Sequence, residues 1–174
     1  MIGTRTADRG RRTRSGDRAR VWIVLVMLVL IEFYVRPSLV SARGLPDFLL
    51  LALLLVALRS PPGTGAIAGL IVGFVVDVLT PARFGAAMLT HVLVGWGAAW
   101  GRAVFFANNL LVNAGLFFVG TWLRNMLMLA ISGASLGELA VEATIWAPIQ
   151  GATTALTGLL IVVLFRDWLA IRAE

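Results

Sequence analysis

Apolar residues in this chain form six long stretches with few charges inside them. They cover residues 21–40, 45–58, 63–79, 84–106, 107–131 and 145–165. A helix needs about 20 mostly apolar residues to cross a membrane, because each residue rises about 1.5 Å and the hydrocarbon layer is roughly 30 Å thick. Five of the six prolines lie at or near the junctions, where a missing N–H does least harm. The pattern predicts an all-α integral membrane protein, a bundle of six transmembrane helices.

The second stretch is the weakest of the six. Its uninterrupted apolar run covers only residues 48–58, which is too short to cross the hydrocarbon layer at right angles. We expect this segment either to tilt in among the other helices or to be re-entrant. A second short helix is expected before the last stretch, because Ser135 and Glu138 have the spacing of a capping box. The alternative there is a simple linker.

The composition agrees with a bilayer as the solvent. Hydrophobic residues make up 59% of the chain and charged residues 14%, against about 45–50% and 25% in soluble domains. The absence of cysteine excludes disulfides and thiol catalysis, and a single histidine leaves little scope for imidazole ligation of a metal. The sequence also lacks the zinc-protease, serine-hydrolase and phosphate-loop motifs. We therefore expect neither an enzyme nor a bound cofactor or metal.

The positive charge is concentrated at one end of the chain. All 15 basic residues are arginines, and seven of them fall within residues 1–20. We expect a disordered basic tail over residues 1–20, a membrane domain over 21–166 and a short tail over 167–174. Such a tail precedes the apolar spans, and we expect it to contact anionic lipid headgroups. It is a poor match for nucleic-acid binding, which needs a basic folded surface.

Arginine counts also predict the orientation, because cytoplasmic flanks are enriched in Lys and Arg. With the N-terminus inside, eleven arginines lie on the inner side and three on the outer side. We therefore expect a multi-pass membrane protein with both termini in the cytoplasm.

Several charged or titratable side chains fall inside the predicted spans, where an unpaired charge is costly. They are Glu32, Arg36, Asp47, Asp77, His91 and Arg124. The first two are four residues apart, so they share one helix face and can pair. In the predicted topology all six lie toward the outer half of the membrane. Three interpretations stay open: ion pairs that stabilise helix packing, a polar pocket or partner-docking surface, and a proton or ion pathway.

The third stretch carries glycines at a strict four-residue spacing. Gly65, Gly69 and Gly73 share one helix face, which ends in Asp77. Glycine at this spacing lets another helix approach backbone to backbone. We expect a helix-packing or partner interface on this face.

Three blocks of the sequence resemble a known family. The first is Leu45-Pro46-Asp47 with a leucine-rich run to Arg59. The second is the Gly69, Gly73 and Asp77 series followed by Phe84-Gly85, and the third is Trp146-x-Pro148. These blocks resemble the rod shape-determining membrane protein family MreD, with Pro46, Gly85, Trp146 and Pro148 as further motif residues.

The resemblance implies a non-catalytic membrane component of the bacterial cell-elongation machinery, which supports cell shape and lateral peptidoglycan synthesis. It implies MreC as partner, and through it MreB, RodA and a class B penicillin-binding protein. It also implies a fold similar to the six-helix substrate-binding subunits of energy-coupling-factor transporters. That likeness supplies an alternative function, the binding of a small ligand such as a vitamin for transport. A proton-coupled carrier using Glu32, Asp77 and Arg124 is a third possibility.

Overall fold

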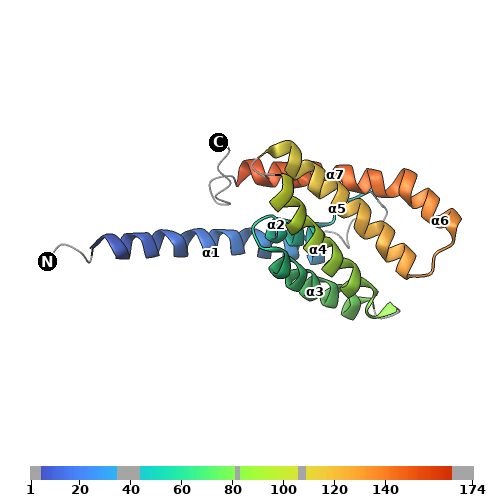
Figure 1. Cartoon of the computed structure of the whole chain (residues 1–174), viewed down its shortest axis with the longest axis horizontal. Coiled ribbons are helices and arrows are strands. Elements are labelled where there is room, and N and C mark those ends of the chain that lie inside the picture. Colours follow the sequence, from blue (N-terminus) through green and yellow to red (C-terminus); the bar gives the residue numbers. More distant parts are fainter. Residues whose placement is uncertain (1–4, 35–43, 81–82, 106–108, 166–174) are drawn as a thin grey trace.

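The computed structural model describes residues 5–34, 44–80, 83–105 and 109–165, and these residues are helical apart from short connections. The α-helices, shown in Figure 1, are α1 (Arg5–Tyr34), α2 (Phe48–Ala57), α3 (Pro62–Leu79), α4 (Ala86–Phe105), α5 (Leu110–Ile131), α6 (Leu136–Val141) and α7 (Ala147–Leu164). A π-helical turn, Glu142–Trp146, joins α6 to α7. The all-α prediction is confirmed over these residues.

Three helical stretches in the described part of the chain are long and apolar enough to cross a membrane. They are Pro62–Leu79, Leu110–Ile131 and Leu136–Leu164. Four helices, α3, α4, α5 and α7, begin and end within three residues of the expected stretches. The short helix before the last stretch is also confirmed, because Ser135 and Glu138 form both hydrogen bonds of a capping box at the start of α6.

Helix α1 begins earlier than expected. We expected a disordered tail up to residue 20, whereas the helix starts at Arg5 and continues without a break to Tyr34. The physical reason is that arginine is a good helix former and the segment holds no proline. Its first half extends away from the other helices (Figure 1). The expected tail at 167–174 lies outside the described residues.

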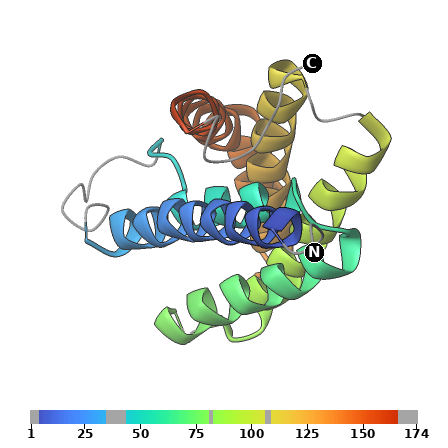
Figure 2. The same cartoon turned by 90° about the vertical axis from the view of Figure 1, so that its left-hand side faces the viewer.

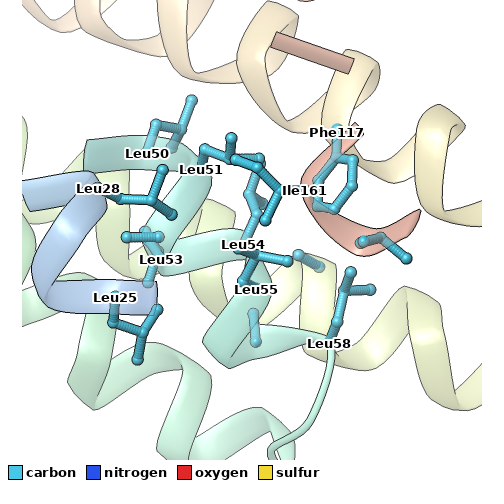
Figure 3. Packing of buried hydrophobic residues seen from close by; sticks show 14 of the residues in the cluster. Leu25, Leu28, Leu50, Leu51, Leu53, Leu54, Leu55, Leu58, Phe117 and Ile161 are labelled. Carbon is cyan, nitrogen blue, oxygen red and sulfur yellow. The ribbon is translucent and has the colours of Figure 1, made fainter. Parts of the chain in front are cut away.

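Helix α2 is the centre of the molecule. It contacts α1, α3, α4, α5 and α7, and eight of its ten residues are buried. Figure 3 shows leucines of α2 meeting Leu28 of α1, Phe117 of α5 and Ile161 of α7. At about 1.5 Å per residue the ten residues cover only about 15 Å, half of a typical hydrocarbon layer. The second stretch is therefore a short helix packed among the others, and whether it is tilted or re-entrant in the membrane stays a prediction.

Two helical hairpins surround α2. Helices α3 and α4 pack closely along their lengths, and so do α5 and α7. Figure 2 shows α3 and α7 on opposite sides of α1. Small residues permit the close approach in the second hairpin, since a Cβ added at Gly158 would lie 2.6 Å from the Phe117 ring.

Candidate functional site

Asp47 joins three helices at one end of the bundle. Its Oδ1 accepts a hydrogen bond of 2.8 Å from the Leu50 N–H, so it is the N-cap of α2. Its Oδ2 forms an ion pair with Nη2 of Arg124 on α5. Its own N–H donates to Oγ1 of Thr154 on α7 over 3.3 Å. We call this end of the bundle the Asp47 end.

Glu32 also caps α2, a role that the sequence did not suggest. Its Oε2 accepts a hydrogen bond of 3.0 Å from the Phe48 N–H. The positive end of the α2 dipole therefore faces two carboxylates, an arrangement that stabilises both the helix and the charges. Arg36, the expected partner of Glu32, lies outside the described residues.

The segment before Asp47 is held against α7. Nε2 of Gln150 donates to the Leu45 carbonyl over 3.2 Å, and Oγ1 of Thr153 donates to the Gly44 carbonyl over 2.8 Å. Gln150 in turn accepts a hydrogen bond of 2.8 Å from Asn125 on α5. Pro46 lies inside this segment, where its missing N–H costs no helical hydrogen bond. The Leu-Pro-Asp block thus connects α2 to α7.

Asp77 holds the start of α4. The carboxylate is buried and accepts hydrogen bonds from the N–H groups of Gly85, Ala87 and Met88 at 2.9, 3.1 and 3.0 Å. These N–H groups belong to the first turn of a helix and have no partner within it. Gly85 has a φ of +99°, which a residue with a side chain rarely adopts. The Gly-x-x-x-Gly-x-x-x-Asp block and Phe-Gly are therefore the two sides of one helical hairpin.

The glycine face of α3 lies against α4 of the same chain. Gly65, Gly69 and Gly73 are buried there. A Cβ added at Gly69 would lie 2.9 Å from the Val92 Cα, and one at Gly73 would lie 2.5 Å from the Met88 Cα. Because α4 occupies this face, we no longer assign it to a partner protein.

A cleft at the Asp47 end brings four of the expected polar residues together. Its volume is about 350 Å³, and its polar lining comes from these four residues, Glu32, Asp47, His91 and Arg124, together with Thr80. Nδ1 of His91 lies 2.7 Å from the Ala87 carbonyl oxygen. Asp77 does not line the cleft, since its carboxylate is engaged with α4. The arrangement connects α1, α2, α4 and α5 through charged and hydrogen-bonding side chains.

The π-helical turn gives Pro148 a structural role. It also reveals a contact between Trp122 and Ala143 that the sequence did not suggest. The Ala147 N–H donates to the Glu142 carbonyl instead of the Ala143 carbonyl, and Pro148 has no N–H to offer. The Ala143 carbonyl therefore lacks both helical donors. Nε1 of Trp122 on α5 supplies the missing hydrogen bond over 3.1 Å.

Replacing Trp122 with phenylalanine should destabilise the protein by about 1–3 kcal/mol, because the part-buried Ala143 carbonyl loses its donor. Phenylalanine keeps a six-membered aromatic ring but lacks the pyrrole part of the indole with its N–H, so part of the loss is packing. Unfolding of the detergent-solubilised protein measures the effect. A Trp96→Phe variant is the control, since Trp96 is half exposed and stacks on Trp100. Equal stability of the two variants would contradict the role of Trp122.

Trp146 lies beside a second and larger cavity. Its volume is about 830 Å³, and it is also lined by Glu138, Glu142, Gln150 and Arg124. Sequence reasoning missed Trp122, Asn125, Gln150 and Thr154. A usable signal existed for the last three, since they are polar residues inside apolar stretches. For Trp122 the signal was indirect. Pro148 has no N–H, so it indicated only that a carbonyl in the preceding turn needs another donor.

No metal-binding cluster of His, Asp and Glu is formed by the residues that the structure describes. No curated protein and no solved structure matches this chain, so the expected likeness to transporter subunits stays a prediction. The family model for the rod shape-determining protein MreD matches residues 16–168, which is most of the chain. The match includes all three blocks whose structural roles are given above. This chain therefore belongs to the MreD family, whose non-catalytic membrane proteins determine rod shape during cell elongation.

Proposed function

We propose that this protein is a docking unit of the rod complex, built from six membrane segments with both termini in the cytoplasm. The observation that supports the proposal is that the polar residues at the Asp47 end hold helices in place. Asp47, Glu32 and Asp77 each hold the start of a helix, and Arg124 is paired with Asp47. These groups maintain a defined helix arrangement, which is what a scaffold has to offer its partners.

The proposed partner is MreC, and through it MreB, RodA and a class B penicillin-binding protein. The family resemblance supports this set. Because the glycine face of α3 is covered by α4, the partner must use other surfaces. Exposed apolar side chains line the outer faces of α3 and α4, including Phe74, Trp96 and Trp100. In the membrane these faces are available to lipid and to partner helices.

Depletion of the protein in its source bacterium tests the proposal. We expect rod-shaped cells to become round and wall insertion to lose its lateral pattern. Reintroducing the unaltered chain should restore both. Cells that keep their shape and their pattern of insertion after depletion would disprove the proposal.

The proposed topology is supported by the arginine counts and by the path of the chain. Helix α2 begins beside Arg124 at the Asp47 end. Arg59 lies at the other end of α2. Its pKa is lowered first by burial and second by the positive charge of Arg102 on α4. Helix α2 therefore runs from the Asp47 end toward the end of α4 that carries Arg102, and we count α2 as the second membrane segment. The architecture of energy-coupling-factor subunits remains our expectation for the whole bundle, and an experimental structure would test it.

Single cysteines should report this topology, because the chain has none of its own. We expect Gly137→Cys to react with an impermeant maleimide in intact spheroplasts and Gly63→Cys to react only after the membrane is opened. Both glycines have nothing within 4 Å of an added Cβ, so neither substitution disturbs packing. Labelling in the reverse order would show that the orientation is inverted. Labelling of both sites in intact spheroplasts would place Gly63 and Gly137 on the same side.

A further inference from the structure

The cleft at the Asp47 end has apolar lips and a polar floor. Phe33 of α1 and Leu79 of α3 line it and are 38% and 58% exposed. Its floor contains Asp47 and His91, both more than nine-tenths buried, together with Glu32 and Arg124. The helix faces beside the lips carry exposed apolar side chains such as Leu30 and Val78. In a membrane such faces meet lipid, so the cleft opens sideways toward the bilayer.

His91 contributes a hydrogen-bond acceptor to this floor. A carbonyl oxygen can only accept, so the contact with Ala87 requires the proton on Nδ1. In the neutral ring the other nitrogen, Nε2, then carries a lone pair. Nε2 forms no hydrogen bond with the described residues and is not enclosed by them. A polar atom facing a membrane cleft needs a donor from water or from a ligand.

The remaining charges indicate which ligand fits. Glu32 and the ion pair of Asp47 with Arg124 lie in the same small space. A carboxylate and a guanidinium each offer more hydrogen-bonding positions than one ion pair uses, so the floor is complementary to a group that carries both a cation and an anion. The imidazole lone pair adds a requirement for a cation that donates hydrogen bonds. A volume of about 350 Å³ lies at the lower end of the range for ligand sites, roughly 300–1,000 Å³, which suits a headgroup better than a whole lipid.

We propose that this cleft binds the headgroup of one amine-bearing phospholipid. The ammonium donates to His91 Nε2 and to the carboxylates, the phosphate faces Arg124, and the acyl chains leave between Phe33 and Leu79. Binding of this lipid is a property of the chain alone and does not depend on its role in the rod complex.

Lipid competition on the full-length protein tests this proposal. The protein is reconstituted with equal amounts of phosphatidylethanolamine and phosphatidylcholine that have identical acyl chains. The two lipids have the same net charge, but the choline headgroup has no N–H donor. Native mass spectrometry then identifies the lipid that remains bound after weakly held lipid is removed. We expect one retained phosphatidylethanolamine and a preference over phosphatidylcholine of about tenfold, the effect of one hydrogen bond between charged or polar groups.

Three variants make the test specific. Leu79→Trp narrows the mouth of the cleft and should abolish retention, whereas Val78→Trp, on the same helix and similarly exposed, should not. His91→Asn keeps a donor for the Ala87 carbonyl but removes Nε2, and should remove most of the preference. The proposal is overturned if the unaltered protein retains no lipid or holds both lipids equally, or if the two tryptophan variants behave alike. Unchanged selectivity in a folded His91→Asn protein would also overturn it.

Discussion

Replacing Gly69 with alanine is expected to separate α3 from α4 and to lower stability by about 3 kcal/mol or more, at the upper end of overpacking effects. The added methyl group would lie 2.6 Å from the His91 carbonyl carbon and 2.9 Å from the Val92 Cα. These are backbone atoms of a helix, so no flexible side chain can move aside. Folded proteins have only about 5–15 kcal/mol of stability, so rod shape should also be lost when this variant is the only copy.

Gly63→Ala is the matched control for this variant. It lies at the start of the same helix, and an added Cβ there would have nothing within 4 Å. Alanine is also the better helix former, so stability should stay the same or rise slightly. Thermal unfolding in detergent and complementation of depleted cells measure both variants. If Gly69→Ala were as stable as Gly63→Ala, the close contact of α3 with α4 would be wrong.

Replacing Asp47 with asparagine should cost about 3–5 kcal/mol, because it leaves the Arg124 guanidinium without its counter-charge in a buried position. The two side chains are only 9% and 17% exposed. Nε of Arg124 already has no partner among the described residues. Asparagine keeps the acceptor for the Leu50 N–H, so the variant isolates the charge from the helix cap.

A double-mutant cycle provides the control for this second variant. Asp47→Asn combined with Arg124→Met removes both charges and retains an apolar stem, so at least half of the lost stability should return. Asp47→Ala should be less stable than Asp47→Asn by about 0.5–2 kcal/mol, the usual value of an N-cap. Additive losses in the double variant would show that Asp47 and Arg124 are not coupled.

Helix positions were largely predictable from the sequence, but helix neighbours were not. Long apolar stretches and proline positions indicate where a helix lies, which is why α3, α4, α5 and α7 fall close to the expected ranges. They do not indicate which face is buried, since lipid is as apolar as a leucine core. Leu54 at the centre of the bundle and Leu156 on its surface are therefore indistinguishable by type, although they are 0% and 67% exposed.

The candidate site was predictable in its members and not in its pairings. The cost of a charge in the membrane identifies Asp47, His91 and Arg124 without any structure. The ion pair joins residues that are 77 positions apart in the sequence. Local spacing cannot predict a contact over such a separation. Local spacing suggested Arg36, which lies outside the described residues, as a partner of Glu32. It did not indicate that the Phe48 N–H at the start of α2 also donates to Glu32. The capping box at Ser135 was predictable because its two members are three residues apart.

The central position of α2 has a consequence for biogenesis. When the ribosome has made only the first four helices, Asp47 still lacks its partners Arg124 and Thr154, which come 77 and 107 residues later. A helix of ten residues that is buried on nearly every side has no stable position in lipid by itself. The nascent chain must therefore keep α2 near the translocon, or at the membrane surface, until α5 and α7 emerge to surround it. The helices that are synthesised last therefore complete the centre of the molecule.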